Sequence, residues 1–150
     1  MLVEASPIKA GLWQGSAPPV GDAVRKSGFD VLVLCAEEYQ PPASAFPGVE
    51  VIHAPNDDSK LTRTQLAGAL QAAHRAALAL KQGKQVLVTC RVGWNRSGLV
   101  SALSLHLLTG KSGGECVGLV QRGREGALGN PYFVAALERL QSATVAQASS

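Results

Sequence analysis

Short apolar runs rich in valine alternate along this chain with segments in which apolar residues recur every three or four positions. Residues 31–35 and 85–89 form nearly continuous apolar runs, which are typical of strands buried on both faces. Residues 12–14 and 49–53 are shorter runs, and Pro55 is expected to end the second one. The pattern therefore predicts these segments as strands.

The longest helix is predicted over residues 62–81, because Thr62 and Gln65 have the spacing of a capping box and Gly83 stands where a terminating glycine belongs. Residues spaced alternately four and three apart form its apolar stripe, namely Leu66, Leu70, Ala73, Ala77 and Leu80. Capping residues and glycines predict further helices over residues 22–27, 97–109, 112–122 and 130–141.

Strands that alternate with helices predict an α/β domain with a small, mostly parallel central sheet flanked by helices. A chain of 150 residues fits one domain of ordinary size. We expect this domain to cover residues 1–142 and the Ala- and Ser-rich residues 143–150 to form a flexible tail. Ligands of such sheets bind at the carboxyl ends of the strands, so the segment after residue 89 is the first place to look for a site.

The composition is that of a soluble globular protein, with 46% apolar and 17% charged residues. No segment has the length of a membrane span, and the first residues do not have the pattern of a signal peptide. Three widely spaced cysteines form neither a disulfide framework nor a zinc motif, which favours a cytoplasmic protein with reduced thiols and no metal site.

The net charge is +3, and its distribution is uneven. Residues 1–75 carry six basic and eight acidic side chains, whereas residues 76–150 carry eight basic and three acidic ones. The second half therefore suits an anionic ligand. Nucleic acid is not an expected partner, because the chain has no dense Lys/Arg run and few aromatic residues.

The segment from Cys90 to Ser97 carries the chemistry. It joins a buried strand to a helix, and Gly93 permits a sharp turn that lets successive N–H groups point inward as an anion-binding nest. A thiolate is favoured at a helix N-terminus and near arginine, and the Arg96 guanidinium can hold two oxygens of a phosphate. The amides of Arg91, Val92, Gly93, Trp94 and Asn95 are the expected substrate-binding groups.

The letters C-R-V-G-W-N-R-S resemble the C-x5-R-[ST] signature of the cysteine-based protein tyrosine phosphatases, and the chain length resembles the dual-specificity branch. Further similarity to that branch lies in residues 12–16, 31–35 and 122–133. The resemblance implies a phosphatase fold in which Cys90 is the nucleophile, Arg96 binds phosphate and Ser97 helps the thiolate leave. One residue departs from the family, since Thr89 stands where histidine is usual.

The resemblance also implies a general acid on a loop some thirty residues before the cysteine. Asp57 and Asp58 follow the predicted strand over residues 49–53, and Asp58 is the family's preferred position of the two. Adjacent carboxylates repel each other, which favours a proton on one of them. The alternative is a solvated turn ahead of the long helix, and the choice between the two aspartates stays open.

Other polar residues are given structural roles. Ser97 is also a plausible helix N-cap, and Trp94 is expected either at the substrate mouth or packed on the domain edge. Arg91 is expected on the solvated rim. The remaining candidates are predicted to be structural or surface residues, and these are Arg122, Arg124, His53, His74, His106, Cys35 and Cys116.

The sequence thus predicts a metal-independent phosphomonoesterase that works through a phosphocysteine intermediate and needs no cofactor. Its substrate would be a phosphorylated protein or a small phosphomonoester. Two alternatives stay open at this stage. One is a phosphate-binding module without turnover, which Thr89 favours, and the other is an enzyme of the same superfamily acting on RNA 5′ ends or phosphoinositides.

Overall fold

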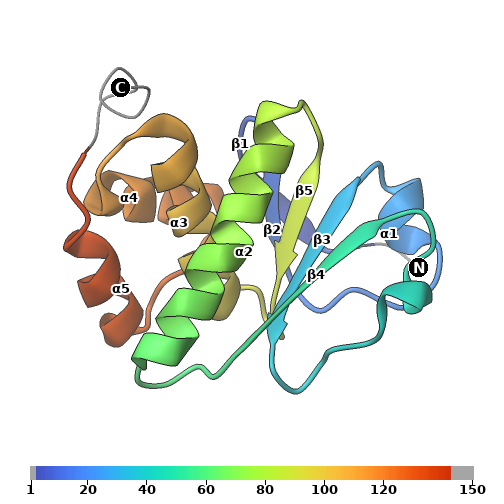
Figure 1. Cartoon of the computed structure of the whole chain (residues 1–150), viewed down its shortest axis with the longest axis horizontal. Helices are drawn as coiled ribbons and strands as arrows, with labels where there is room; N and C mark the ends of the chain where they lie inside the picture. The colour runs from blue at the N-terminus through green and yellow to red at the C-terminus, as the bar shows by residue number, and fades with distance from the viewer. Residues whose placement is uncertain (1–2, 143–150) are drawn as a thin grey trace.

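A five-stranded sheet runs through the molecule, in the spatial order β1-β2-β5-β3-β4 (Figure 1). The computed structural model describes residues 3–142, so the predicted tail over residues 143–150 lies outside it. The strands are β1 (Ala5–Lys9), β2 (Leu12–Gly15), β3 (Val31–Ala36), β4 (Glu50–Asn56) and β5 (Val86–Thr89). All neighbouring strands pair in parallel except β1 and β2, which makes the sheet mostly parallel, as predicted.

Helices cover both faces of the sheet, which confirms the predicted α/β architecture. The helices α2 (Arg63–Lys81), α3 (Arg96–Thr109), α4 (Gly113–Gly123) and α5 (Pro131–Glu138) lie on one side, and α1 (Ala23–Lys26) lies on the other (Figure 1). The first face is packed largely with alanine, valine and leucine, and the second holds Phe29 and Phe46. No helix within residues 3–142 is both long and apolar enough to cross a bilayer.

The predicted helix ends are largely confirmed, because the residues chosen as caps make the expected hydrogen bonds. Thr62 and Ser112 each form a complete capping box, and the Asn130 side chain accepts from the amides of Tyr132 and Phe133. The last helix ends at Glu138 and is therefore shorter than the predicted residues 130–141.

Two strand predictions were incomplete. Strand β1 was not foreseen, because its residues A-S-P-I-K lack a run of β-formers and their burial is mixed. Strand β4 does not stop before Pro55 but continues to Asn56. A proline is tolerated there because β4 is an edge strand, paired only with β3, and Pro55 is exposed.

The parallel strands bring four segments to one edge of the sheet. Strands β2, β3, β4 and β5 all end at this edge, because parallel neighbours run in the same direction. The segments that follow them begin at Ser16, Glu37, Asp57 and Cys90. Residues far apart in sequence thus meet around the strand that ends before Cys90.

Candidate active site

Cys90 lies directly after β5, where the sheet meets the first turn of α3. It is buried, with 4% of its surface exposed, and its Sγ lies 3.2 Å from the Ser97 Oγ. The sequence allowed Ser97 to be the N-cap, but α3 begins at Arg96 and its N-cap is Asn95. Ser97 therefore lies inside the first turn, where its hydroxyl faces the sulfur.

The loop between Cys90 and Arg96 has its carbonyl groups bonded on the outside. The carbonyl oxygens of the four residues after Cys90 each accept a hydrogen bond from a neighbouring segment. Two of these bonds come from backbone amides, to Arg91 O from Ala17 N at 3.2 Å and to Trp94 O from Leu128 N at 3.1 Å. The other two come from the Arg124 side chain, which donates from Nη2 to Val92 O at 2.9 Å and from Nε to Gly93 O at 2.8 Å. A peptide whose carbonyl points outward turns the following amide toward the opposite side. The loop amides are therefore turned away from these outer contacts, which is the orientation that the predicted anion-binding nest requires.

Gly93 is required in this loop for two reasons. Its φ of +86° lies in the left-handed region, which side chains rarely adopt. A Cβ there would also stand 2.5 Å from the Gly15 carbonyl, which is backbone and has little freedom to move. The close approach of β2 to the loop thus explains the glycine.

Two buried polar side chains hold the loop from outside. Gln14 is fully buried and donates from Nε2 to Gly93 O at 2.9 Å. Arg124 is also buried, bonds both carboxylate oxygens of Glu4 at 2.8 and 2.6 Å, and donates to Val92 O and Gly93 O. Sequence analysis gave Arg124 a structural or surface role, and its contacts are with the 90–96 loop, with Glu4 and with strands β1 and β2. Gln14 was missed, because a single glutamine in a short strand carries no signal of burial.

Arg96 is paired with an acidic residue that sequence analysis did not select. Its Nη1 and Nη2 donate to the two carboxylate oxygens of Glu38 at 2.5 and 2.9 Å, and Nη1 also donates to Asn56 O at 3.2 Å. These hydrogen bonds from Arg96 lower the pKa of Glu38 to about 2, and the charge of Arg91 adds to the effect. The only hint in the sequence was an acidic pair, Glu37 and Glu38, directly after a buried strand.

The contacts with Glu38 leave one edge of the Arg96 guanidinium without a partner. Arginine has five N–H bonds, and the three contacts above account for three of them. The Nε atom is buried and has no hydrogen-bond partner within the described residues. Its N–H and the second N–H of Nη2 are parallel, so together they can donate to two oxygens of one oxyanion.

Asp58 and Asp57 make different contacts. The Asp58 carboxylate accepts from Asn95 Nδ2 at 3.1 Å and from Asn130 Nδ2 at 2.9 Å, which joins it to the nest loop. Asp57 accepts from the Ser59 hydroxyl at 2.6 Å and so contacts only its own turn. Of the two candidates, Asp58 is the one held beside the 90–96 loop. Asn130 was not given this role, because its N-cap pattern already explained it.

Thr89 and Trp94 make contacts that the sequence left open. The buried Thr89 hydroxyl donates to Val33 O on β3 at 2.9 Å, so it stabilises the sheet and does not bond to Cys90. The Trp94 ring packs over Gly126, where an added Cβ would lie 2.9 Å from it, and the side chain is still 45% exposed. Trp94 therefore covers the loop after α4 and also reaches solvent.

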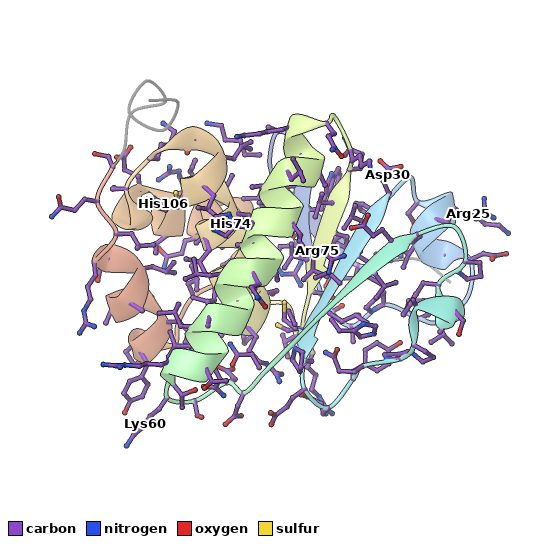
Figure 2. All side chains as sticks on the ribbon, in the orientation of Figure 1. Arg25, Asp30, Lys60, His74, Arg75 and His106 are labelled. Carbon is purple, nitrogen blue, oxygen red and sulfur yellow. The ribbon has the colours of Figure 1, made fainter. Side chains whose placement is uncertain are left out.

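Of the residues predicted to be structural, Arg124 holds the 90–96 loop, and Cys35 lies close enough to Cys90 and Arg96 for their charges to act on its thiol. Burial raises the pKa of the Cys35 thiol well above its usual value and that of Cys116 to about 11. His53 and His106 bond to backbone oxygens, and His74 lies exposed on α2 (Figure 2). Within residues 3–142, no group of three or more His, Cys, Asp or Glu side chains is arranged to hold a metal ion. Arg91, Val92 and Arg122 are exposed.

Neither a protein-family model nor a curated protein matches this sequence. Solved structures do resemble it. A variant of human DUSP28 is 24% identical with a TM-score of 0.77, covering 98% of this chain and 99% of that chain. Tk-PTP in its active form is 26% identical with a TM-score of 0.72, covering 91% of this chain and 97% of that one. PTPMT1 in complex with PI(5)P is 18% identical with a TM-score of 0.75, covering 90% and 92%.

Proposed function

Since the chain has the fold of the cysteine-based protein tyrosine phosphatase superfamily, dual-specificity type, we propose that it is a phosphatase of phosphate monoesters. One observation carries the proposal. A buried cysteine begins a loop whose carbonyl groups from Arg91 to Trp94 are bonded to neighbouring segments, and the loop ends at Arg96, whose buried Nε has no hydrogen-bond partner within the described residues. We infer that the loop amides and the Nε edge of Arg96 surround one site, where a tetrahedral oxyanion would satisfy them.

The first step proposed is attack of the Cys90 thiolate on phosphorus, in line with the bond to the leaving oxygen. An S–P bond forms as the P–O bond breaks, and the nest amides and Arg96 stabilise the charge on the three remaining phosphate oxygens. Glu38 supports this step indirectly, because its ion pair fixes the guanidinium with the Nε edge free. The Ser97 hydroxyl can then donate to the sulfur when the thiolate leaves again.

Asp58 is proposed as the general acid, because it is the aspartate joined to the nest loop. It gives its proton to the leaving alkoxide or phenoxide oxygen. In the second step the same carboxylate takes a proton from water, and the resulting hydroxide attacks the phosphocysteine and releases phosphate. Residues 1–142 would form the single catalytic domain for both steps.

An aryl phosphate assayed in the presence of a chelator tests the proposal. We expect turnover by the wild-type chain and none by Cys90→Ser, because an alcohol at this position is not ionised. Cys90→Ser should still bind orthovanadate, since the nest and Arg96 remain. Full activity in a clean Cys90→Ser preparation would contradict the mechanism.

Arg96→Lys supplies the second arm of the test. One ammonium cannot replace both the pairing with Glu38 and the two-donor edge toward phosphate, so we expect nearly complete loss of turnover. Arg122→Lys is the matched control, because Arg122 is exposed on α4, and it should retain wild-type activity. If the wild-type chain binds vanadate but turns over no phosphorylated compound, the phosphate-binding module becomes the better description.

A panel of phosphotyrosine, phosphoserine, phosphothreonine and phosphoinositide substrates would define the substrate. The similar PTPMT1 structure holds PI(5)P, which makes a phosphoinositide a necessary member of the panel. The expected substrate is a phosphorylated protein or a small phosphomonoester.

A further inference from the structure

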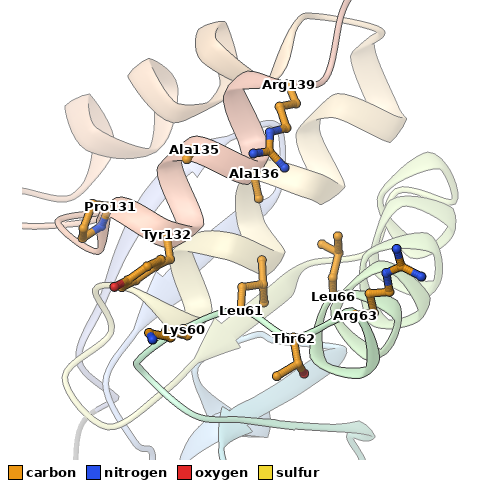
Figure 3. Close-up of a pocket in the computed structure, with 10 residues that line it drawn as sticks. All are labelled: Lys60, Leu61, Thr62, Arg63, Leu66, Pro131, Tyr132, Ala135, Ala136 and Arg139. Carbon is orange, nitrogen blue, oxygen red and sulfur yellow. The ribbon is translucent and has the colours of Figure 1, made fainter.

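A groove of about 600 Å³ lies between the start of α2 and one face of α5, outside the site described above. Residues 60–63 and Leu66 form one wall, and α5 contributes the other (Figure 3). Its volume is in the range of ordinary ligand-binding pockets, about 300–1,000 Å³. The groove has no part in the phosphoryl transfer proposed above.

The groove is lined by three basic side chains and no acidic one. Lys60, Arg63 and Arg139 are all exposed, and none of them pairs with a carboxylate of the described chain within 4.0 Å. Among the other arginines, Arg75, Arg96 and Arg124 have a carboxylate partner, whereas no ion pair within the described residues involves Arg25, Arg91 or Arg122. The positive charge of the groove is therefore available to a ligand.

The groove begins where the candidate active site ends. Lys60 stands two residues after Asp58, and Pro131 directly follows Asn130. Asn130 Nδ2 joins these two segments, because it donates to Asp58 at 2.9 Å and to Ser59 O at 3.0 Å. A ligand that extends past Asp58 would therefore pass directly into the groove.

The lining also contains apolar surface, and its basic groups are spread along the groove. Leu61 and Leu66 belong to the α2 wall and Ala136 to the α5 wall, and Tyr132 is 51% exposed. Lys60 lies near Tyr132 at one end, whereas Arg63 and Arg139 lie at the other end (Figure 3). A compact polyphosphate headgroup would need converging cations. Separated cations with apolar surface between them suit an extended chain with acidic and apolar side chains.

We propose that this groove binds an acidic polypeptide segment next to the phosphorylated residue of a protein substrate. The inference rests on the proposed phosphatase activity and adds a substrate class to it. Binding energy from the segment would hold the phosphorylated side chain over Cys90, so acidic flanking residues should lower KM and leave the chemical step unchanged.

Matched phosphotyrosine peptides test the proposal, one with aspartate and leucine in its flanks and one with asparagine and leucine. We expect kcat/KM to be roughly tenfold higher for the acidic peptide at low salt, from two or three exposed ion pairs. The preference should fall at high ionic strength. Arg63→Gln with Arg139→Gln should abolish it through KM, and Arg63→Glu with Arg139→Glu should favour a lysine-flanked peptide instead.

The control variant removes two positive charges, as the groove variant does, but from arginines outside the groove. Arg25→Gln with Arg122→Gln should keep the preference, because Arg25 lies on α1 at the end of the molecule opposite Lys60 (Figure 2). All these variants should hydrolyse an aryl phosphate like the wild type, since none of the substituted residues belongs to the candidate active site. An unchanged preference in the groove variants would overturn the inference while leaving the phosphatase intact.

Two further outcomes are decisive. If the wild-type chain hydrolyses no aryl phosphate, the proposed function fails, and fluorescence anisotropy with the labelled acidic peptide then tests the groove alone. Loss of that binding in the Arg63→Gln, Arg139→Gln variant would support the groove as an acidic-peptide site, and equal binding would contradict it. In the second outcome, the wild-type chain binds phosphatidylserine vesicles through Arg63 and Arg139 while showing no preference for the acidic peptide. That result would identify the ligand of the groove as an anionic membrane surface and would overturn the peptide proposal.

Discussion

The two loops that meet at Asn95 are held in different ways. The 90–96 loop is fixed from behind by buried side chains, Arg124 and Gln14, which bond its carbonyl groups. The 57–61 loop is mostly exposed, and Asp58 is held by two side-chain amides. The position of the 90–96 loop is therefore set by the packed interior, whereas the position of Asp58, the proposed acid, depends on a few surface contacts. Changes behind the first loop should affect stability and activity together, and changes in the second should affect activity alone.

Arg124→Ala should have the largest combined effect. It removes the donor to Val92 O, leaves Gly93 O with only the Gln14 amide, and breaks the ion pair with Glu4, at a cost of about 3 kcal/mol in the free energy of unfolding. Turnover should fall by roughly 10² because the nest amides lose their orientation. Urea unfolding and aryl phosphate kinetics measure both effects. Arg122→Ala, on the exposed side of α4, should stay within about 0.5 kcal/mol of wild type, and a similar result for Arg124→Ala would contradict this account of the loop.

Asp58→Asn should lower kcat by roughly 10²–10⁴ on a substrate with a poor leaving group, the usual contribution of a general acid. The loss should shrink when the leaving group needs no proton. The fold should be unaffected, because the carboxylate is exposed. Asp57→Asn is the control, since Asp57 bonds only within its own turn. The roles of the two aspartates are reversed if Asp57→Asn shows the leaving-group dependence and Asp58→Asn does not.

Glu38→Gln should change the pH dependence of stability. The pKa of Glu38 is lowered from 4.5 to about 2, chiefly by its hydrogen bonds with Arg96, so the ionised carboxylate is favoured in the folded state. Its stabilisation is complete above about pH 4.5 and is lost as the pH falls through about 2. Thermal unfolding of both proteins between pH 7 and 2 should show a difference that disappears at the acidic end. A difference that is constant with pH would mean that the ion pair does not stabilise the fold.

Thr89→Val should have the smallest effect. It removes one buried hydrogen bond to Val33 O, at a cost of about 1 kcal/mol, and the shape of the side chain is kept. Activity should stay within about threefold of wild type, because the hydroxyl bonds to the sheet and not to the sulfur. A large loss of kcat in a stable variant would give Thr89 a direct part in the chemistry.

Local patterns were sufficient for most elements of the fold. The apolar runs that became β3 and β5 are buried on both faces, and their composition is not compatible with an exposed segment. Thr62, Ser112 and Asn130 were recognisable as caps because a cap acts over three residues. Strand β1 and the passage of β4 through Pro55 were not recognisable, because both depend on a neighbouring or an absent strand.

In the candidate site, too, some features follow from the local sequence and others depend on the tertiary structure. Cys90, Gly93, Arg96 and Ser97 lie within eight residues, so the sequence alone determined the tight loop and, to within one residue, the start of the helix that follows it. The hydrogen-bond partners in the site that belong to different segments lie 31 or more positions apart in the sequence, and only the tertiary structure decided them. Glu38 pairs with Arg96, Asn130 donates to Asp58, and Arg124 and Gln14 bond the carbonyl groups of the 90–96 loop. The physical reason is that a loop's backbone geometry is a local property. The choice of a hydrogen-bond partner depends on which strand ends the sheet brings together, and one-dimensional spacing does not contain that information.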